Sequence, residues 1–182
     1  MATFAAAFRP CNNGAGVFPL STGGPQAIDA TSTVQNYPLG TRINAKDPIL
    51  GECEFVYAKG VASTAAGEAI QINADFTTTR SATPKGHVGI AMSANVANQY
   101  GWYMRKGRAI GKIAADFTAG AAYMSATAGT LQSTAIVGSH IVGMMGATGL
   151  NAGGSAIAGT ADTTAASTVP LHLEYPYAVA AV

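Results

Sequence analysis

Charged side chains are scarce in this chain of 182 residues. They make up 10% of it, against roughly 25% in an ordinary soluble domain, and ten basic residues nearly balance nine acidic ones. Nucleic acids and anionic membranes both attract proteins through clustered positive charge, so we expect neither as a partner. Little charge repulsion remains to keep copies of the chain apart, and we expect other subunits to cover part of its surface.

Long apolar runs and helical periodicity are missing as well. No stretch reaches the ~18 to 20 apolar residues that a membrane-spanning helix needs. The start of the chain has no basic region followed by a long apolar run, which argues against a secretory signal and predicts synthesis in the cytoplasm. No segment carries the apolar stripe and the caps of a long amphipathic helix, so helices are not expected.

Residues suited to catalysis and metal binding are few. Cys11 and Cys53 lie in segments of different composition without the spacing of a disulfide framework; this favours buried thiols and leaves one disulfide open. His87, His140 and His172 do not have the spacing of a metal-binding helix or a zinc knuckle. No nucleophile elbow, Walker loop or dinucleotide fingerprint occurs. We therefore expect a protein that is not an enzyme and has no metal or cofactor.

Small residues dominate the sequence, and alanine, glycine, serine and threonine supply nearly half of it. From residue 49 onward, short apolar or alternating runs are separated by glycine-containing turns. This pattern is typical of strands and predicts an all-β domain over 49–182, a small β-barrel or sandwich. The runs cover 54–62, 67–76, 87–93, 100–117, 120–126, 139–147 and 169–180. The Gly/Ala/Thr-rich segment 146–168 is predicted to be a long loop between the last two strands, with a flexible insertion as the alternative.

Residues 1–48 have a different composition and contain five of the eight prolines. Proline fixes φ and pushes the preceding residue toward extended conformations. We therefore predict an extended N-terminal arm that lies against another surface. Its large apolar side chains are the candidate anchors for a partner: Phe4, Phe8, Phe18, Leu20, Ile28 and Tyr37.

The densest basic cluster consists of Arg105, Lys106, Arg108 and Lys112. Because it alternates with glycines and apolar residues, we interpret it as a solvated strand face or a protein contact rather than a nucleic-acid patch.

One region resembles a known family. Gly101-Trp102-Tyr103, Lys106-Gly107 and Ala109 are followed by ADFTAGAAYMSATAGTLQST over 115–134. This order, across roughly residues 50–145, resembles the capsid decoration proteins of tailed bacteriophages, also called cement or head-stabilising proteins. The motifs are turns and strands rather than a catalytic signature, and they do not cover the arm or the 146–168 segment.

The resemblance implies a β-barrel or β-tulip-like core, homo-oligomers such as dimers or trimers, and no catalysis. It implies a place on the outer capsid surface of the virion, where the protein binds the major capsid protein and bridges its subunits. An extended terminus often grips the shell in such proteins, which would suit residues 1–48. Two alternatives stay open. One is another phage structural subunit, such as a tail tube, spike or head fibre. The other is a carbohydrate- or host-binding module with Tyr100, Trp102 and Tyr103 as a stacking platform, against which core packing is the competing interpretation.

Overall fold

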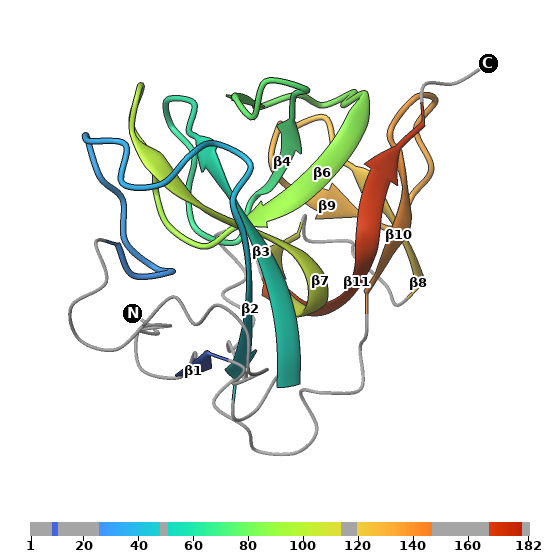
Figure 1. The fold of residues 1–182 in the computed structure, drawn as a ribbon. Coiled ribbons are helices and arrows are strands. Elements are labelled where there is room, and N and C mark those ends of the chain that lie inside the picture. The colour runs from blue at the N-terminus through green and yellow to red at the C-terminus, as the bar shows by residue number, and fades with distance from the viewer. Residues whose placement is uncertain (1–8, 11–25, 48–50, 114–119, 147–167, 180–182) are drawn as a thin grey trace.

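The computed structural model describes residues 9–10, 26–47, 51–113, 120–146 and 168–179 (Figure 1). These residues form eleven strands in one antiparallel sheet, and no helix occurs among them. The predicted all-β class is confirmed. The strands are β1 (Arg9–Pro10), β2 (Arg42–Asp47), β3 (Gly51–Lys59), β4 (Ala69–Ile72), β5 (Thr78–Thr79), β6 (Gly86–Ala91), β7 (Tyr100–Lys112), β8 (Gly120–Met124), β9 (Leu131–Gln132), β10 (His140–Gly146) and β11 (Thr168–Ala178).

The sheet runs in the order β1-β2-β3-β7-β6-β11-β10-β8-β9, with β4 and β5 attached beside β6. It curls until Leu131 of β9 forms an isolated bridge to Ile113, the residue directly after β7, but it does not close into a barrel. The architecture is therefore an open, sandwich-like sheet wrapped around its own core (Figure 1). Of the two architectures that the sequence left open, this is nearer to the sandwich.

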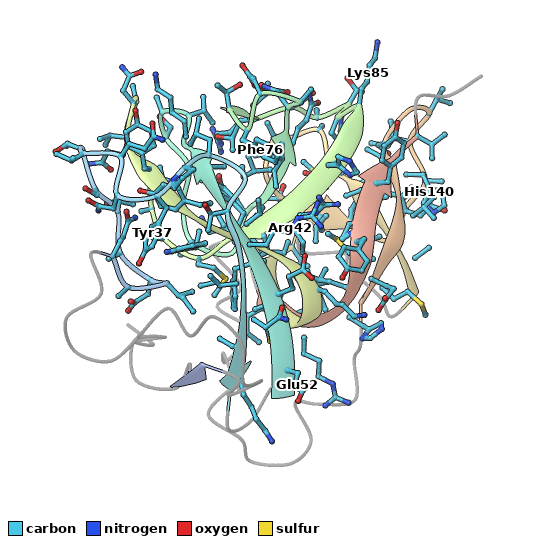
Figure 2. The ribbon with its side chains drawn as sticks, in the orientation of Figure 1. Tyr37, Arg42, Glu52, Phe76, Lys85 and His140 are labelled. Atoms are coloured by element: carbon cyan, nitrogen blue, oxygen red, sulfur yellow. The ribbon has the colours of Figure 1, made fainter. Side chains whose placement is uncertain are left out.

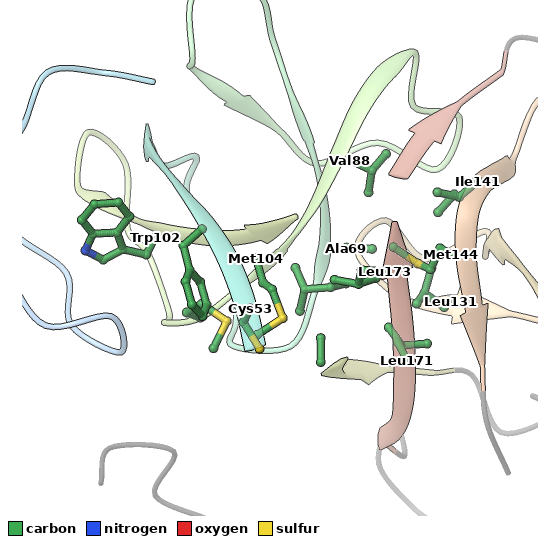
Figure 3. Close-up of a cluster of buried hydrophobic side chains, with 14 of the residues drawn as sticks. Cys53, Ala69, Val88, Trp102, Met104, Leu131, Ile141, Met144, Leu171 and Leu173 are labelled. Atoms are coloured by element: carbon green, nitrogen blue, oxygen red, sulfur yellow. The ribbon is translucent and has the colours of Figure 1, made fainter. Parts of the chain in front are cut away.

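Alternation along β7 separates two buried clusters. Trp102 and Met104 point into the main core, which also contains the side chains labelled in Figure 3. Tyr103, between them, points to the opposite face and packs with Ile70 and Val56 in a second cluster. Successive side chains of a strand face opposite sides, so a single long strand supports both clusters. β7 pairs with β3 along one edge and with β6 and β11 along the other.

The described part of the predicted arm does not form a separate unit. Arg42–Asp47 is strand β2 and pairs with β3 along its whole length. Ahead of it, the Gln26 amide donates to the carbonyl oxygens of Ala30 (2.9 Å) and Tyr100 (2.7 Å) and accepts from the Tyr57 hydroxyl (2.7 Å). These bonds attach residues 26–41 to the sheet, because buried polar groups are stabilised only when they are paired.

β10 ends at Gly146 and β11 begins at Thr168, so both end residues of the 146–168 segment belong to strands. Residues 147–167 lie outside the described residues, and so does Cys11. Cys53 is buried in the main core.

A β-bulge interrupts β7 at Arg105. Glu54 of β3 pairs with Lys106 and Phe55 pairs with Met104, so Arg105 is the extra residue. A bulge of one residue shifts the alternation by one position. As a result, Arg105 and Lys106, although adjacent in sequence, both lie on the face opposite the main core.

Gly107 makes this bulge possible. Its φ is +104°, in the region that side chains rarely adopt, and a Cβ there would meet the carbonyl oxygen of Glu52 and lie 3.0 Å from the Cα of Cys53. Only glycine fits both conditions.

A second irregularity faces the first. The pairing of β10 with β11 shifts between Val142 and Met144, opposite residues 174–176. Leu173 is buried before the shift and Ala178 after it, while Glu174 and Tyr175 are both exposed. The irregularity in β7 thus directs Arg105 and Lys106 away from the main core, and the irregularity in β11 directs Glu174 and Tyr175 to the same side of the sheet.

Candidate functional site

The predicted anchors divide into two groups. Phe4, Phe8, Phe18 and Leu20 lie outside the described residues. Ile28 and Tyr37 are buried in the protein's own main core.

Tyr37 illustrates this placement. Its ring centroid lies 5.3 Å from that of Tyr57 and 5.2 Å from that of Trp102, and burial raises the pKa of its phenol. Ile28 and Tyr37 therefore stabilise this chain and are not presented to a partner in this conformation.

The proposed stacking platform is not at the surface either. Trp102 and Tyr103 are fully buried on opposite faces of β7, and Tyr100 is packed against the main core. These three aromatic side chains therefore pack in or against the core, as the competing interpretation proposed.

The histidines are separated. His87 and His172 lie on different strands, and His140 on a third, where its ring lies 4.9 Å from that of Tyr123. In the part of the chain that the structure describes, no group of three or more His, Cys, Asp or Glu side chains could hold a metal ion. The same residues include no helix long and apolar enough to cross a membrane.

A buried carboxylate links four segments of the fold. Arg80 holds Glu68 with two hydrogen bonds of 3.0 Å, and the Lys112 ammonium lies 3.7 Å away. Glu68 Oε2 also accepts from the amide of Ala65, and a Cβ on Gly129 would meet its carboxylate. With every oxygen engaged by cations or an amide, this site is organised for structural cross-linking rather than proton transfer.

A different polar group lies where three strands meet. The first half of β7 pairs with β6 and the second half with β11, while the end of β11 turns to pair with β6. The two irregular strand positions direct their side chains to this meeting point. We call the resulting group the junction cluster; it comprises Arg42, Glu54, His87, Arg105, Lys106, Glu174 and Tyr175. Arg42 is labelled in Figure 2.

Tyr175 ties the cluster together. It has a positive φ of 48°, and its hydroxyl donates to Glu54 Oε2 at 2.9 Å. Its ring centroid lies 5.2 Å from Lys106 Nζ and 5.9 Å from Arg105 Cζ, which are cation–π distances. The bond to Glu54 raises the pKa of the Tyr175 phenol, so it remains a hydrogen-bond donor at neutral pH.

Two of the cluster's cations have carboxylate partners. Lys106 Nζ lies 3.1 Å from Glu174 Oε1, and the hydrogen bond raises the pKa of the Lys106 ammonium. Arg42 Nη1 lies 3.9 Å from Glu54 Oε1, with Arg42 largely exposed.

Arg105 is the exception. It is only 4% exposed, it takes part in no ion pair within the described chain, and its Nε has no hydrogen-bond partner there. Within the described residues, its one hydrogen bond joins Nη2 to His87 Nδ1 at 2.9 Å. Because the guanidinium can only donate, His87 accepts and carries its proton on Nε2.

This contact sets the ionisation of the histidine. Burial, followed by the positive charges of Arg105 and Arg42, lowers the pKa of His87. Burial also lowers the pKa of Arg105 from a very high ordinary value, so the guanidinium remains charged. The cluster therefore holds three permanent cations and two carboxylates around a neutral histidine.

An apolar and aromatic surface continues from the cluster across β11 and β10. We call it the β10–β11 face; it comprises Val142, Met145, Tyr175, Tyr177 and Val179, which are 39–57% exposed. Val142 and Tyr177 are direct cross-strand partners, and the Tyr177 ring meets the His87 ring edge-on at 5.5 Å. Exposed apolar side chains normally occur singly, and a group of five on β10, on β11 and at the residue directly after β11 is typical of a contact surface.

Comparison with known proteins found no match, whether a family model, a curated protein or a solved structure. The exposed tyrosines and methionine of the β10–β11 face belong to the residue types that are enriched in protein interfaces.

The sequence contained part of this signal. The sequence predicted a solvated strand face or a protein contact for the basic cluster, but in the structure its four side chains do not share one environment. Lys106 and Arg108 are exposed, whereas Arg105 is buried and Lys112 approaches Glu68. Sequence reasoning missed Tyr175 and the rest of the β10–β11 face. Plain alternation over 169–180 puts Tyr177 and Val179 on the same side as Leu171 and Leu173, so no local pattern marks them as exposed. They face outward because the pairing of β10 with β11 shifts between Val142 and Met144.

Proposed function

We propose that this protein is a non-enzymatic structural component of a tailed-bacteriophage virion. It binds the outer surface of the capsid and stabilises the shell by bridging neighbouring major capsid subunits. The observation that carries the proposal is the β10–β11 face, a group of exposed aromatic and apolar side chains on an all-β chain. The resemblance of residues 101–131 to capsid decoration proteins supplies the class of partner.

The residues of that resemblance have structural roles that suit a rigid scaffold. Trp102 and Tyr103 fill the two buried clusters. Ser125 and Thr130 close the turn before β9, where each hydroxyl donates to the carbonyl of Thr127. A contact surface on a rigid sheet loses little entropy when it binds.

The mechanism is the burial of weak contacts in many copies. Covering exposed apolar area yields roughly 25 cal/mol per Å2 before ordering costs. Symmetric repetition over a shell, and self-association into dimers or trimers, then adds avidity without new contacts. The low net charge of +1 favours this crowding, because neighbouring copies repel one another weakly.

The test is to add the purified protein to phage shells that lack it and to measure bound protein after sedimentation. Tyr177→Ala removes an aromatic side chain from the β10–β11 face, and we expect at least about a tenfold loss of affinity. Val34→Ala is the matched control. Val34 is 66% exposed and lies in the blue segment on the opposite side of the molecule from β10 and β11 (Figure 1).

Equal binding by both variants and the parent would reject the β10–β11 face as the contact surface. Absence of the protein from purified particles would reject the function as a whole. Its presence in tails or fibres instead of shells would favour the alternative, another phage structural subunit.

A further inference from the structure

The buried guanidinium of Arg105 is the least explained charge in the described chain. Taking an ion out of water costs several kcal/mol unless an opposite charge and hydrogen bonds compensate it. Arg105 has the aromatic ring of Tyr175 and the ring nitrogen of His87 beside it, but no carboxylate in ion-pair contact. Its Nε donor is buried and unpaired.

The charges around it pair off without it. Glu174 is matched by Lys106 at 3.1 Å, and Glu54 by Arg42 at 3.9 Å. Three cations against two carboxylates leave one positive charge. Arg105 is the cation of the cluster that has no direct ion pair among the described residues, and Glu54 attracts its charge only from a longer distance. One added negative charge would neutralise the cluster.

We propose that the junction cluster is a recognition site for one carboxylate group, the side chain of an aspartate or glutamate on the partner protein, bound by Arg105. The partner is the surface that the proposed function assigns to the β10–β11 face, so this inference rests on that proposal. Tyr175, which belongs to both the cluster and the face, brings the two sites together.

The chemistry favours a carboxylate over a phosphate. Both groups match the fork of a guanidinium. A phosphate carries up to two negative charges and would lie beside Glu54 and Glu174, which would repel the second charge, whereas a carboxylate supplies the single charge that is missing.

Arg42 offers a second donor at the edge of the site. Its side chain is 58% exposed and holds Glu54 only loosely, so it is free to turn toward an incoming carboxylate. Arg105 is only 4% exposed and its Cζ lies 5.9 Å from the centroid of the Tyr175 ring, so side chains of the cluster have to move when a carboxylate binds.

The experiment uses acetate as the probe and the full chain labelled with 15N. Sodium acetate replaces sodium chloride at constant ionic strength, and the Nε–H resonance of Arg105 is followed by NMR. We expect a saturable shift that chloride does not produce and that Arg105→Gln abolishes. Arg108→Gln, which removes an exposed cation from the same strand, should retain the shift.

Glu54→Gln keeps Arg105 intact and provides the readout if Arg105→Gln fails to fold. Removing a competing carboxylate should tighten acetate binding by at least about twofold. No saturable acetate shift in the parent, or an unchanged acetate affinity in Glu54→Gln, would overturn the inference. A second titration with inorganic phosphate that gives tighter binding than acetate would overturn the choice of a carboxylate.

Shell binding then separates this inference from the proposed function. Arg105→Gln should lose at least about tenfold in shell affinity, the equivalent of one charge-assisted hydrogen bond, while Arg108→Gln stays within about twofold. If the parent binds shells and Arg105→Gln binds equally well, the carboxylate site is wrong and the proposed function stands. If the parent binds acetate but does not bind shells, the proposed function is wrong, whereas the carboxylate site at Arg105 is confirmed.

Discussion

Replacing Gly107 by alanine tests whether the bulge in β7 is required by the fold. Gly107 has a φ of +104°, and an added Cβ would meet the backbone of Glu52 and Cys53. The unfavourable φ alone costs alanine roughly 1 kcal/mol. Forcing a methyl group against packed backbone adds roughly 1 to 3 kcal/mol. We therefore expect Gly107→Ala to lower the free energy of unfolding by about 2 to 4 kcal/mol.

Gly86→Ala is the matched control. Gly86 has a φ of +91°, but its nearest contact to an added Cβ is an ordinary 3.9 Å, to the Tyr177 ring. It should lose only the backbone term of about 1 kcal/mol. Urea unfolding of both variants and the parent measures the difference by linear extrapolation. If Gly107→Ala is no less stable than Gly86→Ala, the close approach at the bulge does not constrain the fold and our account of how Arg105 is placed is wrong.

Three further predictions concern buried and titrating groups. Glu68→Gln leaves two cations unbalanced and should cost about 3 kcal/mol of unfolding free energy; an effect below about 1 kcal/mol in urea would refute the cross-linking role. Burial raises the pKa of Tyr103 to about 12, and its hydroxyl accepts from Asn95 at 2.7 Å. Tyr103→Phe should therefore lose about 1 to 2 kcal/mol and remove the phenol that titrates last in an ultraviolet pH titration. Because the pKa of His87 is lowered in the folded state, the stability from its neutral form is complete above its ordinary value of 6.5 and is lost as the pH falls below that value. His87→Gln should flatten the pH dependence of the urea midpoint from pH 7 to about pH 5, and parallel profiles would contradict this.

The strands were predictable because their signal is local. Period-2 alternation by itself places His172 opposite Leu171 and Leu173, and in the structure both leucines are buried and the histidine is exposed. It also places Ala122 and Met124 on one face, and both are buried. Period-2 patterns and glycine turns suffice for such predictions.

The described part of the N-terminal segment was misjudged because proline content hid a strand. Arg42–Asp47 lies between Pro38 and Pro48 and has only two apolar side chains, so nothing local distinguished it from an extended arm. It pairs with β3, the next strand along the chain. Ile28 and Tyr37 were selected as partner anchors for their size, but the cavity that they fill is formed by residues more distant in sequence, including Tyr57 and Trp102.

The candidate site was not predictable from alternation because it exists where alternation fails. A bulge reveals itself only when two strands are aligned, and the partners of Arg105 come from β6 and β11. The sequence contains Gly107 and Gly143 at the two irregular positions, but glycine occurs 22 times, and nothing local separates these two from glycines of ordinary turns.

The orientation of the chain in an intact particle tests the central claim most directly. An electron cryomicroscopy map of purified virions should show this protein on the outer capsid surface with Val142, Tyr175 and Tyr177 covered by a major capsid subunit or by a second copy of the chain. A map in which the protein is present but these three side chains face solvent would contradict the account.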